Sequence, residues 1–163
     1  NSTNGKNNLI KNFLKNNMEK INREKTRIYI PLKLSEGINP HQMEERLQKI
    51  MDEYAGGVSR YYEMNECELN IALKKINQLK SQIKYLTAEN YHQLMNCHEV
   101  IDRIEIAEVL IHHLLYRKET RWPAYQTRTD FPEKNDSEWL KFVNSYRKEN
   151  QIKIIERSYE KTV

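Results

Sequence analysis

The segment that most constrains the fold begins at Thr87 or Asn90 and runs to about Lys118. Its apolar residues recur three and four positions apart, which places them together on helix faces. These residues are Leu94, Met95, Ile101, Ile104, Val109, Leu110, Ile111, Leu114 and Leu115. We therefore predict one long helix here, the most apolar element of the chain and the centre of its core.

Two further helices carry local start signals. Asn39 is followed by Pro40 and, three positions after the cap, by Gln42, which together predict an N-cap, a first-turn proline and a capping box. Asn65 and Glu68 repeat the cap signal for a second helix. The first helix carries Met43, Leu47, Ile50, Met51 and Tyr54 and ends at Gly56–Gly57; the second carries Leu69, Ala72, Leu73, Ile76, Leu79, Ile83 and Leu86.

The segments outside these helices give weaker signals. Residues 1–26 are rich in asparagine but carry a helical stripe of apolar residues from Leu9 to Ile21, so we expect a short helix. Residues 28–34 alternate apolar and polar side chains around Pro31, which predicts an extended stretch. Near the C-terminus, Ile152, Ile154 and Ile155 predict a strand or an extended arm.

The connection after the long helix is expected to be irregular. Pro123 and Pro132 bound a loop, after which Asn135 or Asp136 caps a short helix carrying Trp139, Leu140, Phe142 and Val143. With short connections between the long helices, we predict an all-α fold. It is a three-helix antiparallel bundle, similar to a spectrin repeat, with a short fourth helix and an extended C-terminal tail.

Charge and hydropathy exclude several functions. The net charge of +4 is spread along the helices with both signs interleaved, so nucleic-acid binding is not expected. No apolar run reaches the ~20 residues of a membrane-spanning helix, and the N-terminus lacks the apolar core of a secretory signal. The two cysteines, Cys67 and Cys97, are expected to be reduced thiols in a cytoplasmic protein. The first residue is not methionine, which suggests a piece of a larger protein.

No catalytic constellation is evident. His112 and His113 are adjacent, so on a helix they point in different directions and cannot share a metal ion. The carboxylates of Asp130, Glu133, Asp136 and Glu138 are better explained by a solvated loop leading into a capped helix than by acid–base catalysis. With only four glycines, the chain has no dinucleotide fingerprint and no phosphate-binding loop.

The charged residues around the loop leave two interpretations open. Arg117, Lys118, Glu119, Arg121 and Arg128 are consistent with cations that stabilise a helix C-terminus. Together with nearby aromatic residues they are also consistent with a docking surface, because arginine, tryptophan and tyrosine dominate interface anchors. The aromatic residues are Trp122, Tyr125, Phe131 and Trp139, some of which are expected to cover the end of the helix bundle instead.

Three sequence runs resemble one known family. They are R-K-E-T-R-W at 117–122, R-x-D-F-P-E-K-N-D at 128–136, and L-Q-K-I-M-D-E-Y-A-G at 47–56. The chain is similar, over about residues 26–157, to the C-terminal region of the flavoprotein subunits of fumarate reductase, succinate dehydrogenase and adenylylsulfate reductase. Trp122 favours the adenylylsulfate reductase branch. Asn135 replaces the first of two aspartates usual in the family, which leaves Asp136 to cap the short helix.

The resemblance implies a module of a larger oxidoreductase. Residues 1–26 would be the end of the flavin domain or a linker helix, and residues 27–163 the C-terminal helical domain. This domain would pack on the flavin domain of the same polypeptide and contribute to the surface that faces an iron–sulfur subunit. The parent protein would hold FAD, and this chain no cofactor or metal. We expect a cytoplasmic protein, or one held at the inner face of a membrane by partner subunits.

The resemblance also indicates which residues form the site. Arg117, Glu119, Arg121, Trp122, Arg128 and Asp130 match the family's signature positions, and we expect them to dock the domain. None is expected to be catalytic, and the substrate stays open among succinate, fumarate, adenylylsulfate and other compounds. The alternative is a free-standing helical interaction module that dimerises through the Leu69–Leu86 face.

Overall fold

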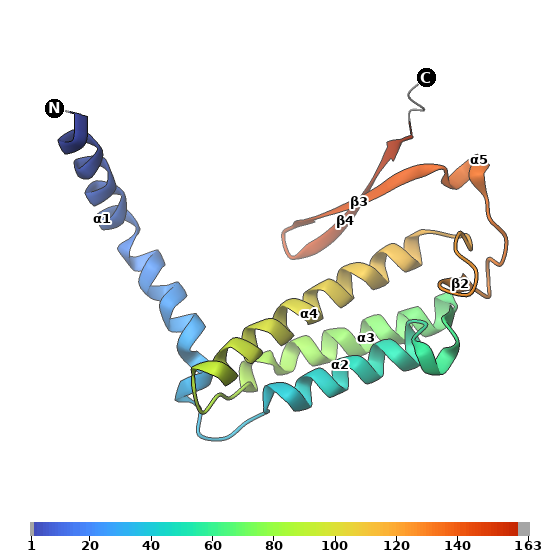
Figure 1. The fold of residues 1–163 in the computed structure, drawn as a ribbon, viewed down its shortest axis with the longest axis horizontal. Helices are drawn as coiled ribbons and strands as arrows, with labels where there is room; N and C mark the ends of the chain where they lie inside the picture. Colours follow the sequence, from blue (N-terminus) through green and yellow to red (C-terminus); the bar gives the residue numbers. More distant parts are fainter. Residues whose placement is uncertain (1, 160–163) are drawn as a thin grey trace.

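The computed structural model describes residues 2–159 and is mostly helical. Helices α2 (Pro40–Tyr54), α3 (Glu66–Gln82) and α4 (Tyr91–Tyr116) lie side by side, and each contacts the other two (Figure 1). The buried core between them is formed by Met43 and Leu47 of α2, by Leu69, Ala72, Ile76 and Leu79 of α3, and by Leu94, Cys97, Val100, Ile104, Ala107, Ile111 and Leu114 of α4. Helix α4 supplies the largest share, as the sequence predicts.

Asparagine side chains cap all three helices. Asn39 accepts a hydrogen bond from the His41 backbone N–H at 2.9 Å, and the Gln42 side chain accepts one from the Asn39 N–H at 3.3 Å, which completes a capping box. Asn65 and Asn90 cap α3 and α4, each bonding the N–H three residues ahead at 3.0 Å. Each cap contributes about 1 kcal/mol, so local sequence sets where these helices begin.

Helix α1 (Ser2–Tyr29) is longer than expected and leads directly into the 3-10 helix η1 (Ile30–Lys33). The predicted extended stretch at 28–34 is therefore largely wrong. Pro31 lies in the first turn of η1, where its missing N–H is not needed. Residue 1 and residues 160–163, at the ends of the predicted domain ranges, lie outside the described residues, as does the side chain of Leu9.

Two small sheets show that an all-α description is too narrow. β1 (Glu63–Met64) pairs in parallel with β2 (Thr127–Arg128), and β3 (Lys141–Lys148) pairs antiparallel with β4 (Gln151–Ser158). Two further 3-10 turns, η2 (Val58–Arg60) and η3 (Ile83–Tyr85), follow α2 and α3. The predicted C-terminal strand is thus one arm of a hairpin.

The short helix α5 (Asp136–Trp139) ends before Phe142 and Val143, which the sequence placed in it. Both residues belong to β3, where Val143 is half-buried and Phe142 is exposed, the alternation of a strand. A two-residue turn closes the hairpin with positive φ at Glu149 (50°) and Asn150 (61°), the backbone pattern that matches the twist of a hairpin.

The hairpin is attached to α4 by charged side chains. Arg147 of β3 donates to the buried Glu108 of α4 at 3.0 Å, and Lys80 of α3 donates to the same carboxylate at 2.7 Å. Burial disfavours the charged form of Glu108, but the hydrogen bonds from Lys80 and Arg147 outweigh it and hold its pKa below the ordinary value. Near the C-terminus of α4, Tyr116 donates to Glu156 of β4 at 2.8 Å.

Within residues 2–159, no helix is both long enough and apolar enough to cross a membrane.

Candidate functional site in the loop after helix α4

Arg128 is the centre of the loop that follows α4. Its side chain is 1% exposed and donates to the carbonyls of Leu114 and, at 3.0 Å, Arg117, both at the C-terminal end of α4. It also binds the Asp130 carboxylate through two bonds of 2.8 and 2.7 Å. A guanidinium at this place satisfies carbonyls that the helix leaves free and complements the negative end of the helix dipole.

Asp130 ties the loop to a second helix. Its Oδ2 accepts the backbone N–H of Glu66 at 2.9 Å, in the first turn of α3. The hydrogen bond from Arg128 is the main reason that the pKa of Asp130 lies below its ordinary value. The neighbouring β1–β2 pair joins the same two segments, with Met64 opposite Arg128. The loop is therefore anchored at the C-terminus of α4 and at the N-terminus of α3.

Glu119 organises the other half of the loop. It is 3% exposed and accepts two bonds from Arg121, at 2.7 and 2.9 Å, one from Arg117, and one from the Asn135 backbone N–H at 3.0 Å. Burial works against its charge, but these donors outweigh burial and keep its pKa below the ordinary value. An anion with four donors stays ionised and fixes the residues around it.

The prediction that Asp136 caps the short helix is wrong. Asn135 is the cap, with its side chain accepting the Glu138 N–H at 3.1 Å, while Asp136 is the first helical residue. Asn135 has the non-helical backbone that an N-cap requires, and this leaves the Asp136 carboxylate free for other partners. It binds Lys134 at 2.8 Å and Arg121 at 2.9 Å, bonds that lower its pKa.

One buried polar residue was missed in the sequence. Thr120 is 4% exposed, and its hydroxyl donates to the Phe131 carbonyl at 2.8 Å and accepts the Arg128 N–H at 2.9 Å. It therefore closes the loop on itself. A lone threonine within a charged run gives no sequence signal, because nothing local shows that it will be buried.

The aromatic residues divide between the two interpretations that the sequence left open. Trp139 is 5% exposed and packs edge-on to Tyr116 at 5.7 Å between ring centroids, so it covers the end of the helices. Phe131 is half-buried under the Arg128 guanidinium. Trp122 and Tyr125 are 66% and 76% exposed, although the Tyr125 ring lies 6.4 Å from that of Tyr62 between centroids. These two are the docking candidates.

The described carboxylates of the loop are stabilised in their charged form. Each loop carboxylate with a shifted pKa is pushed downwards by cationic or N–H partners, whereas a general acid or base needs a pKa near the working pH. His113 is partly buried, and burial, followed by repulsion from Arg117 and His112, lowers its pKa. Among the described residues no group of three or more metal-ligating side chains comes together. The described contacts hold the loop against the ends of α3 and α4.

Comparison with known proteins identifies the family. Residues 44–162 match the family described as the fumarate reductase flavoprotein C-terminus, which is well over half of the chain. The chain belongs to this family. Its matched region includes most of α2 and all of α3, α4, the loop and the hairpin.

Relatives within the family are much longer than this chain. The alpha subunit of adenylylsulfate reductase from Megalodesulfovibrio gigas is 34% identical over 115 residues, which are 71% of this chain and 17% of that protein. An uncharacterized FAD-dependent oxidoreductase of Methanocaldococcus jannaschii is 31% identical over 102 residues, 63% of this chain and 17% of that protein. The chain therefore spans about a sixth of the length of these curated relatives.

Solved structures share the fold. Adenylylsulfate reductase from Archaeoglobus fulgidus superposes with a TM-score of 0.84 at 36% identity, over 88% of this chain and 25% of that one. Quinol fumarate reductase from E. coli gives a TM-score of 0.70 over 90% of this chain and 25% of that one, but its 17% identity shows a common fold alone. The resemblance inferred from the sequence runs is confirmed.

The fold argues against the alternative of a module that dimerises through the Leu69–Leu86 face. Leu69 and Ile76 of α3, and Leu86 after η3, are at most 1% exposed, because this stripe packs into the core. A face that is already buried within one molecule is not available for dimerisation.

Proposed function

We propose that this chain acts as the C-terminal helical domain of an FAD-dependent oxidoreductase and docks on a flavin domain of the same polypeptide. The main support for the proposal is the structure of the loop at residues 117–136. Buried ion pairs hold this loop in place, and it presents Trp122 outward with 66% of its surface exposed. A large aromatic side chain on a rigid support loses little entropy on binding, which suits it as an anchor.

The six predicted docking residues take two roles in this proposal. Five of them bond to one another and to helix ends, and so position the loop: Arg117, Glu119, Arg121, Arg128 and Asp130. Trp122, with Tyr125 beside it, makes the contact itself. The domain boundary near residue 26 lies inside the unbroken α1, which favours a linker helix between the two domains.

The remaining parts of the proposal concern the whole enzyme. FAD would be held by the preceding domain, because this chain has no dinucleotide fingerprint. An iron–sulfur subunit is the second proposed partner, and the enzyme would be cytoplasmic or attached to the inner face of a membrane through such subunits. The adenylylsulfate reductase branch is favoured by Trp122 and by the 36% identity with that enzyme against 17% with fumarate reductase.

The test is a Trp122→Ala substitution in the complete flavoprotein, with Tyr91→Ala as the matched control. Tyr91 is 74% exposed and lies at the opposite end of α4. We expect Trp122→Ala to lower flavin reduction by substrate and the melting temperature of the flavin-loaded protein, while far-ultraviolet circular dichroism stays the same. Arg121→Ala should act in the same direction by loosening the loop. If Trp122→Ala behaves like Tyr91→Ala in both assays, the docking role is wrong.

A further inference from the structure

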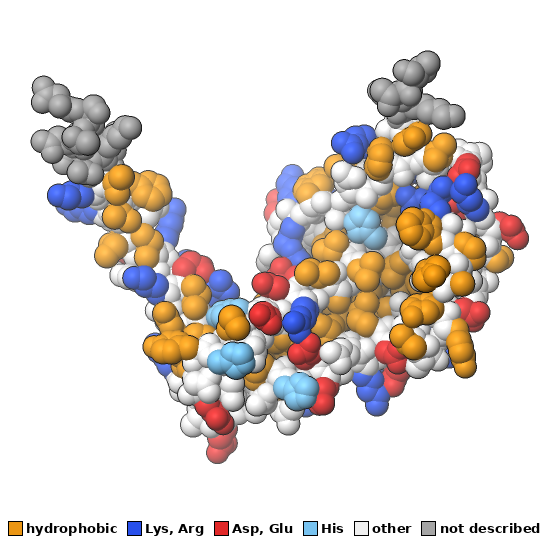
Figure 2. All heavy atoms as spheres, in the orientation of Figure 1, with side chains coloured by type: hydrophobic (Ala, Val, Ile, Leu, Met, Phe, Trp, Pro, Cys, Tyr) orange, Lys and Arg blue, Asp and Glu red, His pale blue; other side chains and the backbone are white. Residues whose placement is uncertain are grey.

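The two faces of the C-terminal hairpin differ in charge. Residues that lie opposite one another in an antiparallel pair project on the same face. One face, here called the outward face, consists of exposed pairs: Phe142 with Arg157, Asn144 with Ile155, Tyr146 with Lys153, and Lys148 with Gln151. It carries three cations and, among the described residues, no carboxylate. In Figure 2 cationic side chains lie beside apolar ones close to the C-terminal end of the described residues.

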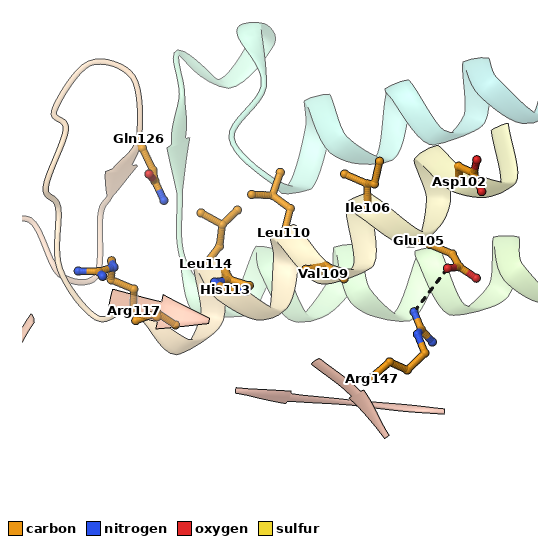
Figure 3. Close-up of a pocket in the computed structure, with 11 residues that line it drawn as sticks. Asp102, Glu105, Ile106, Val109, Leu110, His113, Leu114, Arg117, Gln126 and Arg147 are labelled. Atoms are coloured by element: carbon orange, nitrogen blue, oxygen red, sulfur yellow. Dashed lines mark ion pairs between the residues drawn. The ribbon is translucent and has the colours of Figure 1, made fainter. Parts of the chain in front are cut away.

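The opposite face of the hairpin is used by the chain itself. Arg147 on this face donates to Glu108 of α4 at 3.0 Å. Figure 3 shows Arg147 reaching from β3 toward α4, where it also lies 4.0 Å from Glu105. The apolar side chains of this face are half-buried: Val143, Ile152 and Ile154. The hairpin therefore rests on α4 through this face and leaves the outward face uncovered by the described residues.

The cations of the outward face have no acidic partner in the part of the chain that the structure describes. The Lys153 ammonium donates to the Gln151 side chain at 2.9 Å, and the Arg157 guanidinium lies 4.9 Å from the centroid of the Phe142 ring. On the opposite face, by contrast, Lys141 and Arg147 each bind a glutamate. Cations without neighbouring carboxylates favour a partner of negative charge.

Strand β4 also has a free hydrogen-bonding edge. It pairs with β3 in a sheet of two strands, and no other described hydrogen bond uses its backbone. Such a hairpin is marginally stable in water, and an unpaired edge of eight residues is a template for a further strand. The edge of β3 is less available, because the Lys141 carbonyl accepts a hydrogen bond from Arg117 at 3.1 Å. An extended segment can therefore add to β4.

We propose that the free edge of β4 binds an extended, acidic segment of a different protein. The added strand pairs with the backbone of β4, and its carboxylates lie opposite Lys153 and Arg157, where cross-strand pairs of opposite charge are favourable. A second copy of β4 offers no carboxylate on this face to meet these cations. A nucleic acid lacks the alternating donors and acceptors of a strand. The inference concerns a surface outside the loop of residues 117–136 and does not rest on the proposed function.

The experiment measures, by fluorescence anisotropy, the binding of a labelled peptide of alternating glutamate and valine to the complete polypeptide. The same peptide with glutamine in place of glutamate reports the contribution of charge. Lys153→Glu combined with Arg157→Glu is compared with Lys74→Glu combined with Lys84→Glu, an equal change of net charge at exposed lysines of α3 and η3. We expect binding to weaken about tenfold in the hairpin variant and less than about threefold in the control, because only the former turns favourable cross-strand pairs into like-charge pairs.

Hydrogen exchange locates the bound peptide on the unsubstituted protein, so the test does not depend on the folding of any variant. We expect the acidic peptide to slow exchange at 151–158 and to leave α2 unchanged. Absence of binding, unchanged exchange in β4, or equal weakening in both variants overturns the inference. Tighter binding of a short oligothymidylate that the hairpin variant loses assigns the face to a nucleic acid instead. Exchange in β4 that slows as the protein concentration rises, without peptide, assigns the edge to a second copy.

Discussion

Replacing Arg128 by methionine tests whether the buried guanidinium holds the loop to the helices. Methionine keeps much of the apolar volume but removes every hydrogen bond to Asp130 and to the carbonyls of Leu114 and Arg117. Removing one partner of a buried ion pair costs about 3–5 kcal/mol. The Asp130 side chain is 26% exposed and can regain some hydration, so we expect a loss near the lower end, about 3 kcal/mol.

The assay is urea unfolding of the chain followed by circular dichroism. Arg103→Met is the matched control, because Arg103 also binds two carboxylates, those of Glu44 and Glu99, but its side chain is 47% exposed. Surface pairs of this kind contribute at most about 1 kcal/mol. Arg128→Lys, which keeps the charge but not the fork of donors, should fall between the two. A loss of less than 1 kcal/mol for Arg128→Met would refute the reasoning.

Three further predictions follow from the same contacts. Glu119 and Asp130 have folded-state pKa values below the ordinary ones, so their contribution to folding stability is complete above about pH 4–5 and declines as the pH falls below about 4. Glu119→Gln should make the denaturant midpoint fall less steeply over this pH range, and an unchanged slope contradicts the prediction. Glu108→Gln should speed hydrogen exchange in the hairpin at 141–158 while leaving α2 unaffected, since it weakens the bonds from Lys80 and Arg147. A uniform change, or none, would argue that Glu108 does not attach the hairpin to α4. Gly56→Ala should destabilise by about 1 kcal/mol or more, because φ is +73° and the new methyl meets the Met64 side chain; an unaltered melting temperature would show that the turn adapts.

Local signals in the sequence predicted the helices well. The caps at Asn39 and Asn65 act over two or three residues, so the donor and the acceptor of each bond are close together in the sequence. The apolar stripes of α2, α3 and α4 pack inward as expected. The hairpin was only half predicted, because its turn at Glu149–Asn150 lacks the glycine that usually marks positive φ.

The parts that the sequence could not predict depend on long-range contacts. Asp130 bonds to the Glu66 N–H, 64 residues away, and no local pattern connects the two. The resemblance pointed to six signature residues, but it does not show which of them turn inward. The structure makes that distinction: Glu119 and Arg128 are buried among their partners, and Trp122 faces outward.

The most direct test of the account is the flavin content of the native polypeptide that contains these residues. It can be purified through an affinity tag at its carboxyl terminus, and its intact mass and bound flavin measured together. The account predicts one flavin on a polypeptide several times longer than 163 residues, in line with relatives of which this chain covers 17% to 25%. A native polypeptide of this length alone, without flavin, would contradict it.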